Sequence, residues 1–282
     1  MNNVRSILRI TRYQFLQLVR NPRLYMIMIC NFIFLSTLIV PLRRFMKLYY
    51  VKATPFLFGF LFSHASVVFC FFVGIVLLFS NAPFFNHSQM FLVIRTKKLV
   101  WALGQMLYLL AGSVLYFLLL YGMSLLFLIP HISFRNEWGE VWNTLVRTDL
   151  GLQCGVTLAI SADILNRFDP MELQCWIFLI GVLNALLIGL ILFFCNLYFH
   201  REVGITVAIL LILAPYRLSF MPDFLHYIVT VAWLDPTYLF YSPTYKGPDG
   251  MQQLLILCGM ILFFIFCCIY GIYHRDLPEV EE

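Results

Sequence analysis

Charged side chains are scarce in this sequence of 282 residues. Aspartate, glutamate, lysine and arginine together make up only 12% of it, whereas hydrophobic residues make up 62%. An ordinary soluble domain carries about a quarter charged residues. A soluble protein of this size would have to expose far more apolar surface than water tolerates. The composition therefore excludes a soluble enzyme, a disordered chain and a nucleic-acid-binding domain.

The motifs of catalysis and metal binding are also missing. The eight cysteines include no C-x-x-C pair, and seven of them lie inside apolar runs. This placement favours small buried hydrophobic side chains over zinc ligands or disulfides. No Ser/His/Asp order and no paired carboxylates in an apolar cleft stand out. We therefore expect no catalytic residue and no metal site in this chain.

The sequence also lacks an ATP-binding motif and a carboxylate that could couple transport to an ion gradient. It contains no G-x-x-x-x-G-K-[ST] phosphate loop, and its long apolar segments leave no room for a nucleotide-binding domain. No carboxylate lies in the middle of an apolar run, as a proton- or sodium-driven carrier would normally need. We expect the chain to be no enzyme, to hold no cofactor and to draw any pumping energy from a partner.

What the sequence has is long apolar runs. A helix needs roughly 20 apolar residues to cross about 30 Å of hydrocarbon. The runs predict an all-α polytopic membrane protein, a single transmembrane domain over residues 1–282, with both termini on one side. The predicted spans are about 24–42, 56–80, 99–129, 173–198, 202–216 and 252–273. The fifth is short; either residues 196–201 extend it, or a re-entrant segment at 219–234, between spans five and six, completes it.

The N-terminal segment reads as a basic amphipathic helix that ends at Asn21-Pro22. On a helical wheel its apolar residues, Phe15 among them, share one sector, and its arginines share another. These arginines are Arg5, Arg9, Arg12, Arg20 and Arg23. Such a helix lies in the membrane interface with arginines toward anionic headgroups. It is either a passive anchor or a helix that transmits movement from a partner.

A second short amphipathic segment follows the second predicted span. Ser88 is a suitable N-cap, Met90 to Ile94 offer an apolar face, and basic residues come next. Either a partner's groove buries this face, or the segment is an interfacial turn followed by snorkelling lysines. The candidate residues are Ser88, Gln89, Met90, Phe91, Leu92, Val93, Ile94 and Arg95.

Three further predictions concern polar and aromatic residues. His64, in the second span, makes either an interhelical hydrogen bond or a substrate or gating contact. Leu150 to Ala162 is mildly apolar and is expected to form a helix on the outer surface. Trp233, Tyr238, Tyr241 and Tyr245 fit an interfacial aromatic belt or, alternatively, substrate contacts.

The order of these features resembles the ABC type-2 permease family, the membrane subunits of type-2 ABC exporters. The resembling stretches are Arg20-Asn-Pro-Arg23, Leu92 to Leu107, Trp233-Leu-Asp-Pro-Thr-Tyr238 and Tyr273 to Leu277. Each motif is loose, and their order and spacing carry the resemblance. Two features depart from the family pattern: Asp235 stands where the family often has Asn, and the 131–172 segment is longer than in many members.

The resemblance implies a permease subunit of an ATP-driven transporter in a bacterial cytoplasmic (plasma) membrane, with both termini cytoplasmic. The implied partners are a cytoplasmic ABC ATPase, which binds ATP and Mg, and a second permease subunit. Residues 88–95 would form the ATPase-coupling helix, and Asn31, His64 and Pro215 would lie near the pathway. The apolar, aromatic walls suit export of an amphiphilic or hydrophobic substrate such as a peptide, drug or lipid.

Two other functions remain open at this point. A non-transporting immunity or sensor protein would use the same scaffold. An intramembrane lipid-modifying enzyme would need clustered carboxylates or histidines, whereas the six histidines here are scattered along the chain.

Overall fold

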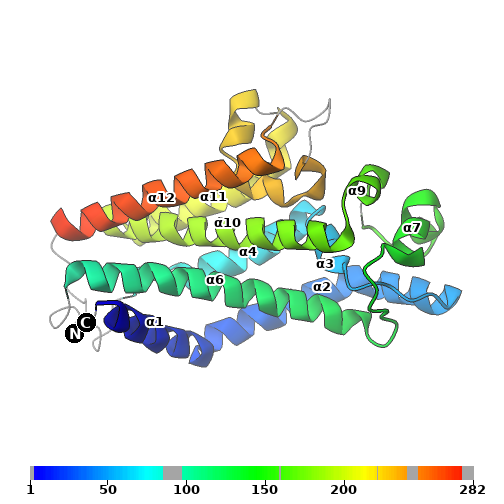
Figure 1. The fold of residues 1–282 in the computed structure, drawn as a ribbon, viewed down its shortest axis with the longest axis horizontal. Helices are drawn as coiled ribbons and strands as arrows, with labels where there is room; N and C mark the ends of the chain where they lie inside the picture. The colour runs from blue at the N-terminus through cyan, green and yellow to red at the C-terminus, as the bar shows by residue number, and fades with distance from the viewer. Residues whose placement is uncertain (1–2, 85–96, 159, 221, 240–246, 275–282) are drawn as a thin grey trace.

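The computed structural model describes residues 3–84, 97–158, 160–220, 222–239 and 247–274, and these residues form a bundle of helices (Figure 1). Within these ranges no β-strand occurs, only an isolated bridge between Ala53 and Ile132. The helices long and apolar enough to cross a membrane are α2 (Pro22–Tyr49), α6 (Lys98–Leu128), α10 (Pro170–Tyr198) and α12 (Gly250–His274). The all-α membrane class predicted from the sequence agrees with this architecture.

Shorter helices complete the bundle. They are α1 (Asn3–Arg20), α3 (Leu57–Leu61), α4 (Ala65–Phe79), α7 (Gly139–Arg147), α8 (Leu150–Gln153), α9 (Ala162–Arg167) and α11 (Arg201–Leu213). Four 3-10 segments follow α11, namely η1 (Ala214–Phe220), η2 (Asp223–Tyr227), η3 (Thr230–Leu234) and η4 (Pro236–Leu239).

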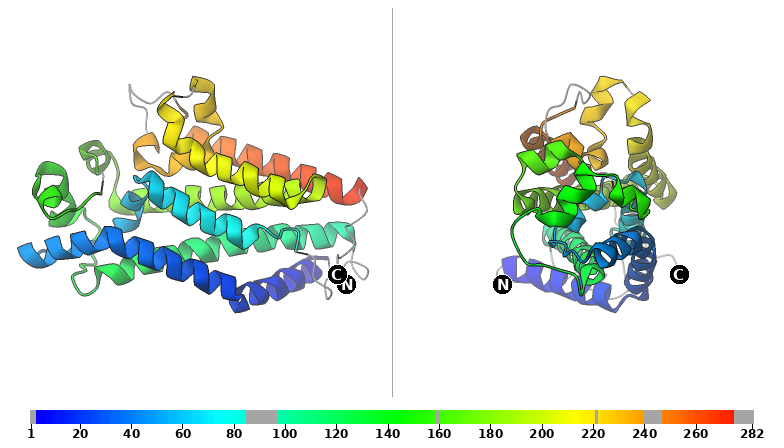
Figure 2. Two further views of the ribbon diagram at one scale, coloured as in Figure 1. Left: turned by 180° about the vertical axis from the view of Figure 1, so that it is seen from behind. Right: turned by 90° about the vertical axis from the view of Figure 1, so that its right-hand side faces the viewer.

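The bundle has two distinct ends. At the α1 end, α1 lies beside the start of α6, and the end of α12 lies on the other side of α6; at the α7 end, α7 lies beyond the end of α6 (Figure 1). Helices α2, α6 and α11 run from the α1 end toward the α7 end, whereas α4, α10 and α12 run back. Viewed along the bundle, α1 lies across it rather than along it (Figure 2). This is the orientation expected of an interfacial helix.

Helix α10 forms the centre of the bundle. It packs against α4, α6, α11 and α12, and most of its side chains are buried. Helices α2 and α12 instead expose many large apolar side chains, such as Ile33, Leu255 and Phe266. Because lipid tails are as apolar as these side chains, helices in a bilayer associate through close packing and hydrogen bonds. The points of closest approach between helices therefore matter most for the stability of this bundle.

One such point joins α6 to α10. The ring of Phe117 lies over Gly181, where an added Cβ would be 2.7 Å from the ring's Cζ and 2.9 Å from its Cδ1. Aromatic side chains from α3, the α3–α4 break, α4 and α10 surround the same ring, with centroid distances between 6.1 and 6.3 Å; they are Phe58, Phe62, Phe72 and Phe178. Only a glycine at 181 leaves room for this arrangement.

Several predicted boundaries differ from the structure. The helix that contains the first predicted span is longer than that span, because α2 continues through Arg43 and Arg44 to Tyr49. The second is not one helix over 56–80, because residues 62–64 separate α3 from α4 and His64 has an extended backbone at the start of α4. The fifth ends at Leu213, and 3-10 turns replace a regular helix beyond it.

The predicted helix over Leu150 to Ala162 is wrong. Helix α8 ends at Gln153, and Gly155 adopts a φ of +78°, a left-handed conformation that stops the helix. A separate helix, α9, then begins at Ala162, where the side chain of Ser161 accepts a hydrogen bond from the Asp163 amide (3.2 Å). Polar and glycine residues therefore divide this mildly apolar segment into short pieces.

Candidate functional site

The amphipathic helix α1 is docked on the first turns of α6. The Thr11 hydroxyl donates to the carbonyl oxygen of Gly104 (3.1 Å), and both groups are buried. A Cβ at Gly104 would lie 2.8 Å from Cγ2 of Ile10. Helix α1 is connected to α2 by Asn21, whose side chain accepts from the Arg23 amide (3.0 Å). Movement of α1 would therefore be transmitted to both α2 and α6.

The arginines predicted to face the headgroups are exposed on α1, namely Arg5, Arg9, Arg12 and Arg20. The predicted apolar sector is divided between two surroundings. Thr11 and Leu18 are buried on the side that faces the bundle, whereas Val4 and Leu8 are exposed and Phe15 is half-buried. Helix α1 thus presents one face to protein, a second apolar face to its surroundings and a third, basic face.

The candidate coupling segment, Ser88–Arg95, lies outside the described residues. Its flanks are described, and both are at the α1 end. Before it, the ring of Phe84 packs edge-on against Tyr108 of α6, with centroids 5.0 Å apart. After it, the carbonyl of Lys97 accepts from the Val100 amide (2.9 Å) and starts α6.

A pocket of about 560 Å³, here called the arginine pocket, lies at the same end of the bundle. It is lined by Gln14, Gln17, Leu18, Asn21, Arg23, Leu78, Ser80, Asn81, Ala82, Pro83, Phe84, Tyr108, Asn196, Leu197 and Arg201. Arg201 donates to the Ser80 hydroxyl (3.2 Å), and the Asn196 amide donates to the carbonyls of Ser80 (3.0 Å) and Ala82. Sequence reasoning missed this pocket, because its residues come from distant parts of the chain.

Asn31 belongs to a hydrogen-bonded joint between three helices. Its side-chain amide donates to the Tyr116 hydroxyl (2.9 Å), which donates to the Phe71 carbonyl (2.7 Å). The Cys70 thiol donates to the side-chain oxygen Oδ1 of Asn31 (3.3 Å). The joint ties α2 to α4 and α6, and a Cβ at Gly74 would overlap the Tyr116 hydroxyl. Asn31 therefore has a structural partner in this conformation.

The Tyr116 joint gives a direct prediction. Replacing Tyr116 by Phe should lower the free energy of unfolding by about 1–2 kcal/mol, since the Asn31 amide and the Phe71 carbonyl lose their partner. The measurement is thermal unfolding of the detergent-purified chain, with the exposed Tyr25→Phe of α2 as the matched control. Equal stability of the two variants would contradict a structural role for the joint.

His64 lies where α3 gives way to α4. Its Nε2 is buried without a hydrogen-bond partner among the described residues, so the expected interhelical hydrogen bond is not seen there. Two more side chains have buried polar atoms without such partners. They are Ser63, in the same α3–α4 break, and Gln174 of α10. Neither His64, Asn31 nor the half-buried Pro215 of η1 lines the arginine pocket.

Asp235 connects η3 to η4 near this break. Its carboxylate accepts from the Thr237 amide (3.0 Å) and hydroxyl (2.8 Å). Asp235, which stands where the ABC type-2 permease family often has Asn, is therefore bound by Thr237 within its own turn.

The predicted aromatic belt is not formed by Trp233. This side chain is fully buried, and its indole N–H donates to the carbonyl oxygen of His226 (3.0 Å). Tyr238 is half-buried, whereas Tyr241 and Tyr245 lie outside the described residues. Trp233 holds the 3-10 segments together, which the sequence pattern alone does not reveal.

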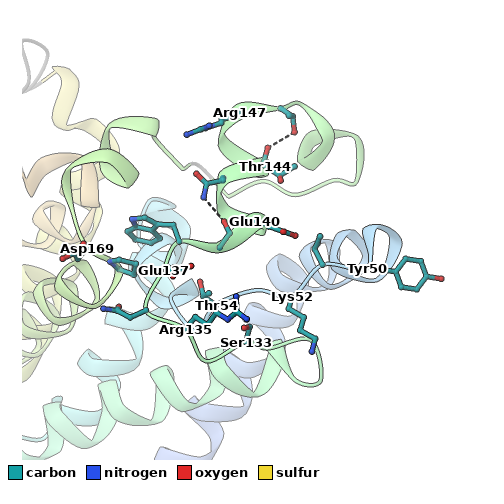
Figure 3. A pocket seen from close by; sticks show the side chains of 17 residues that line it. Tyr50, Lys52, Thr54, Ser133, Arg135, Glu137, Glu140, Thr144, Arg147 and Asp169 are labelled. Atoms are coloured by element: carbon teal, nitrogen blue, oxygen red, sulfur yellow. Dashed lines mark hydrogen bonds between the residues drawn. The ribbon is translucent and has the colours of Figure 1, made fainter.

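A larger pocket, here called the α7 cup, opens at the opposite end (Figure 3). It encloses about 1020 Å³, and its charged lining residues are Lys52, Arg135, Glu137, Glu140, Arg147 and Asp169. Two indole N–H groups hold its wall: Trp142 donates to the Thr54 hydroxyl (2.8 Å) and Trp138 to the Phe168 carbonyl (3.0 Å). Sequence reasoning found no site in this segment, because the cup forms only when residues 50–54 meet α7.

No family model, curated protein or solved structure matches the chain. In the part of the chain that the structure describes, no group of three or more His, Cys, Asp or Glu residues is arranged to hold a metal ion.

Proposed function

We propose that this chain is the membrane permease subunit of an ATP-driven transporter of the ABC type-2 kind, powered by a separate ATPase. The observation that carries the proposal is the contact of α1 with the first turns of α6, beside the two flanks of residues 85–96. A partner bound at 88–95 would push on residues that precede α6 in the chain, and the first turns of α6 contact α1. Those two helices, with α2, would carry the movement into the bundle.

The proposed topology has six crossings. Besides the four long helices, α4 is extended by α3, and α11 is extended by the 3-10 segments η1–η4. The opposite directions of successive helices support this count (Figure 2). We place the α1 end in the cytoplasm of a bacterial cell, since a cytoplasmic ATPase must reach residues 88–95.

A conformational change driven by ATP requires contacts that differ between two states. We propose that such a change alters the Asn31–Tyr116 joint, which hydrogen bonds hold, and the α3–α4 break, which interrupts a helix. We propose that the pathway opens near Asn31, His64 and Pro215, between this permease and a second one. Apolar walls there would suit an amphiphilic or hydrophobic substrate.

The test is whether ATP hydrolysis depends on the coupling segment. The tagged chain is purified in mild detergent from membranes of its own host, and ATP hydrolysis is measured with and without vanadate. We expect vanadate-sensitive hydrolysis with the wild type and none with the double variant Met90→Glu/Val93→Glu, because charges on the apolar face prevent docking in a partner's groove.

The control is Leu152→Glu, which places the same charge on an exposed apolar residue of α8 at the α7 end. It should leave hydrolysis unchanged. Unaltered hydrolysis in the Met90→Glu/Val93→Glu variant, or no hydrolysis with the wild type, would refute the proposal.

A second function, ligand binding without transport, is favoured by the α7 cup. Its mixture of basic and acidic side chains suits a zwitterionic ligand such as a peptide. A receptor of this kind would bind peptide in sealed vesicles without ATP-dependent accumulation, whereas a permease with its ATPase would accumulate substrate. The same vesicle experiment thus distinguishes the two functions.

A further inference from the structure

We propose that the arginine pocket binds the phosphate headgroup of an anionic phospholipid, with Arg23 and Arg201 as the phosphate-binding residues. Arg23 and Arg201 are exposed residues that both line the pocket, and none of its described lining residues is acidic. Two like charges in one pocket repel each other unless an anion lies between them. Glu202 follows Arg201 in the sequence but is exposed and does not line the pocket.

The helices around the pocket add to its preference for an anion. Arg23 lies in the first turn of α2 and Arg201 in the first turn of α11. Helix N-termini carry partial positive charge and unpaired N–H groups, which favour phosphate. Arg201 is also oriented by its hydrogen bond to Ser80. Arginine binds phosphate oxygens through a planar pair of N–H groups, so both residues suit this ligand.

The depth of the pocket identifies the source of the phosphate. Gln14, Gln17 and Leu18 of α1 line it, so it lies at the level of the amphipathic helix. A helix of this kind rests between the headgroups and the acyl chains of a bilayer. A phosphate that enters at this depth is therefore most readily supplied by a lipid of the same leaflet.

The pocket also offers a surface for the apolar part of a lipid. Leu18, Leu78, Phe84 and Leu197 line it together with the polar groups. Leu18, Leu78 and Leu197 are buried and Phe84 is half-buried, so they form an apolar wall that the glycerol backbone and first methylenes of a lipid would contact, whereas a soluble phosphate has no apolar part. This combination of two arginines and an apolar wall favours a phospholipid over a free anion. The inference does not depend on the proposed transport function.

Native mass spectrometry of the full-length chain in detergent tests the inference. The protein is titrated with phosphatidylglycerol or with phosphatidylcholine, and bound lipids are counted. We expect one lipid site that prefers phosphatidylglycerol, and we expect Arg23→Gln/Arg201→Gln to weaken it by about tenfold or more. Arg23→Lys/Arg201→Lys should weaken it less, since lysine keeps the charge but not the paired N–H groups.

The matched control is Arg5→Gln/Arg9→Gln, which removes two exposed arginines from α1 at the same end but outside the pocket. This variant should keep the site. Equal loss in both double variants would show general attraction to a basic surface and overturn the proposal. Equal binding of phosphatidylcholine, or displacement of the lipid by millimolar inorganic phosphate, would also overturn it.

A second measurement avoids any loss of fold in the arginine variants. A photoreactive amino acid replaces Asn81, which is exposed and lines the pocket. Irradiation of the otherwise wild-type protein in mixed bilayers should cross-link it to phosphatidylglycerol in preference to phosphatidylcholine. The same substitution at the exposed Leu152 of α8 should show no preference, and equal labelling of the two lipids at position 81 would contradict the assignment.

Discussion

Gly181→Ala is expected to lower the free energy of unfolding by about 1–3 kcal/mol, the usual cost of overpacking a core. The new methyl group would overlap the Phe117 ring, which has no exposed surface. The ring cannot move aside, because aromatic side chains from α3, α4 and α10 surround it. The measurement is thermal unfolding of the detergent-purified protein, monitored by the loss of monodisperse material.

The control is the same substitution in a helix where the methyl group meets nothing. Gly259 of α12 has no atom within 4 Å of a built Cβ. Because alanine favours the helix by up to about 1 kcal/mol over glycine, Gly259→Ala should be neutral or stabilising. If Gly181→Ala were as stable as Gly259→Ala, the close approach of α6 and α10 would be wrong.

Gly104→Leu is expected to have the largest effect on function. A side chain at this position would collide with Ile10, 2.8 Å from the built Cβ, and would lift α1 from α6. The Thr11–Gly104 hydrogen bond would be lost with it. If α1 transmits the partner's movement, vanadate-sensitive ATP hydrolysis by the purified complex should fall about tenfold or more, within the usual range of coupling between sites.

The matched control lies in the same helix. Gly122 of α6 has open space where a side chain would be built, so Gly122→Leu should leave hydrolysis unchanged. Displacement of α1 is measured separately, by the reaction of Thr11→Cys with a water-soluble maleimide: the buried residue should react only when Gly104→Leu is also present. A displaced α1 with normal hydrolysis would refute its role in transmission.

The sequence was sufficient to predict the elements with long or strongly periodic patterns. Residues 173–198 and 252–273 lie within α10 and α12, and the basic amphipathic pattern of residues 1–22 corresponds to α1. In each case a single physical requirement, burial in lipid or a two-sided environment, extends over many residues. Local exceptions have little influence on such a pattern.

The missed features depend on contacts between distant residues. No proline or glycine at residues 62–64 signals the break between α3 and α4. Trp233 looked like an interfacial aromatic, but its burial depends on how the 3-10 segments fold on one another. Each pocket combines residues from at least three separate segments of the chain, so neither has a sequence motif. The candidate coupling segment and the pathway residues Asn31, His64 and Pro215 stay predictions.

The length of α2 has a consequence for how ligands would reach each end. Its 28 residues extend over about 42 Å, against about 30 Å of hydrocarbon. In the proposed topology the turns that carry Arg43, Arg44 and Lys47 therefore project into water, together with the α7 cup at the same end. A molecule would reach the cup by diffusion through solution. The arginine pocket lies at the depth of α1, so its ligand would arrive sideways, by diffusion within the leaflet.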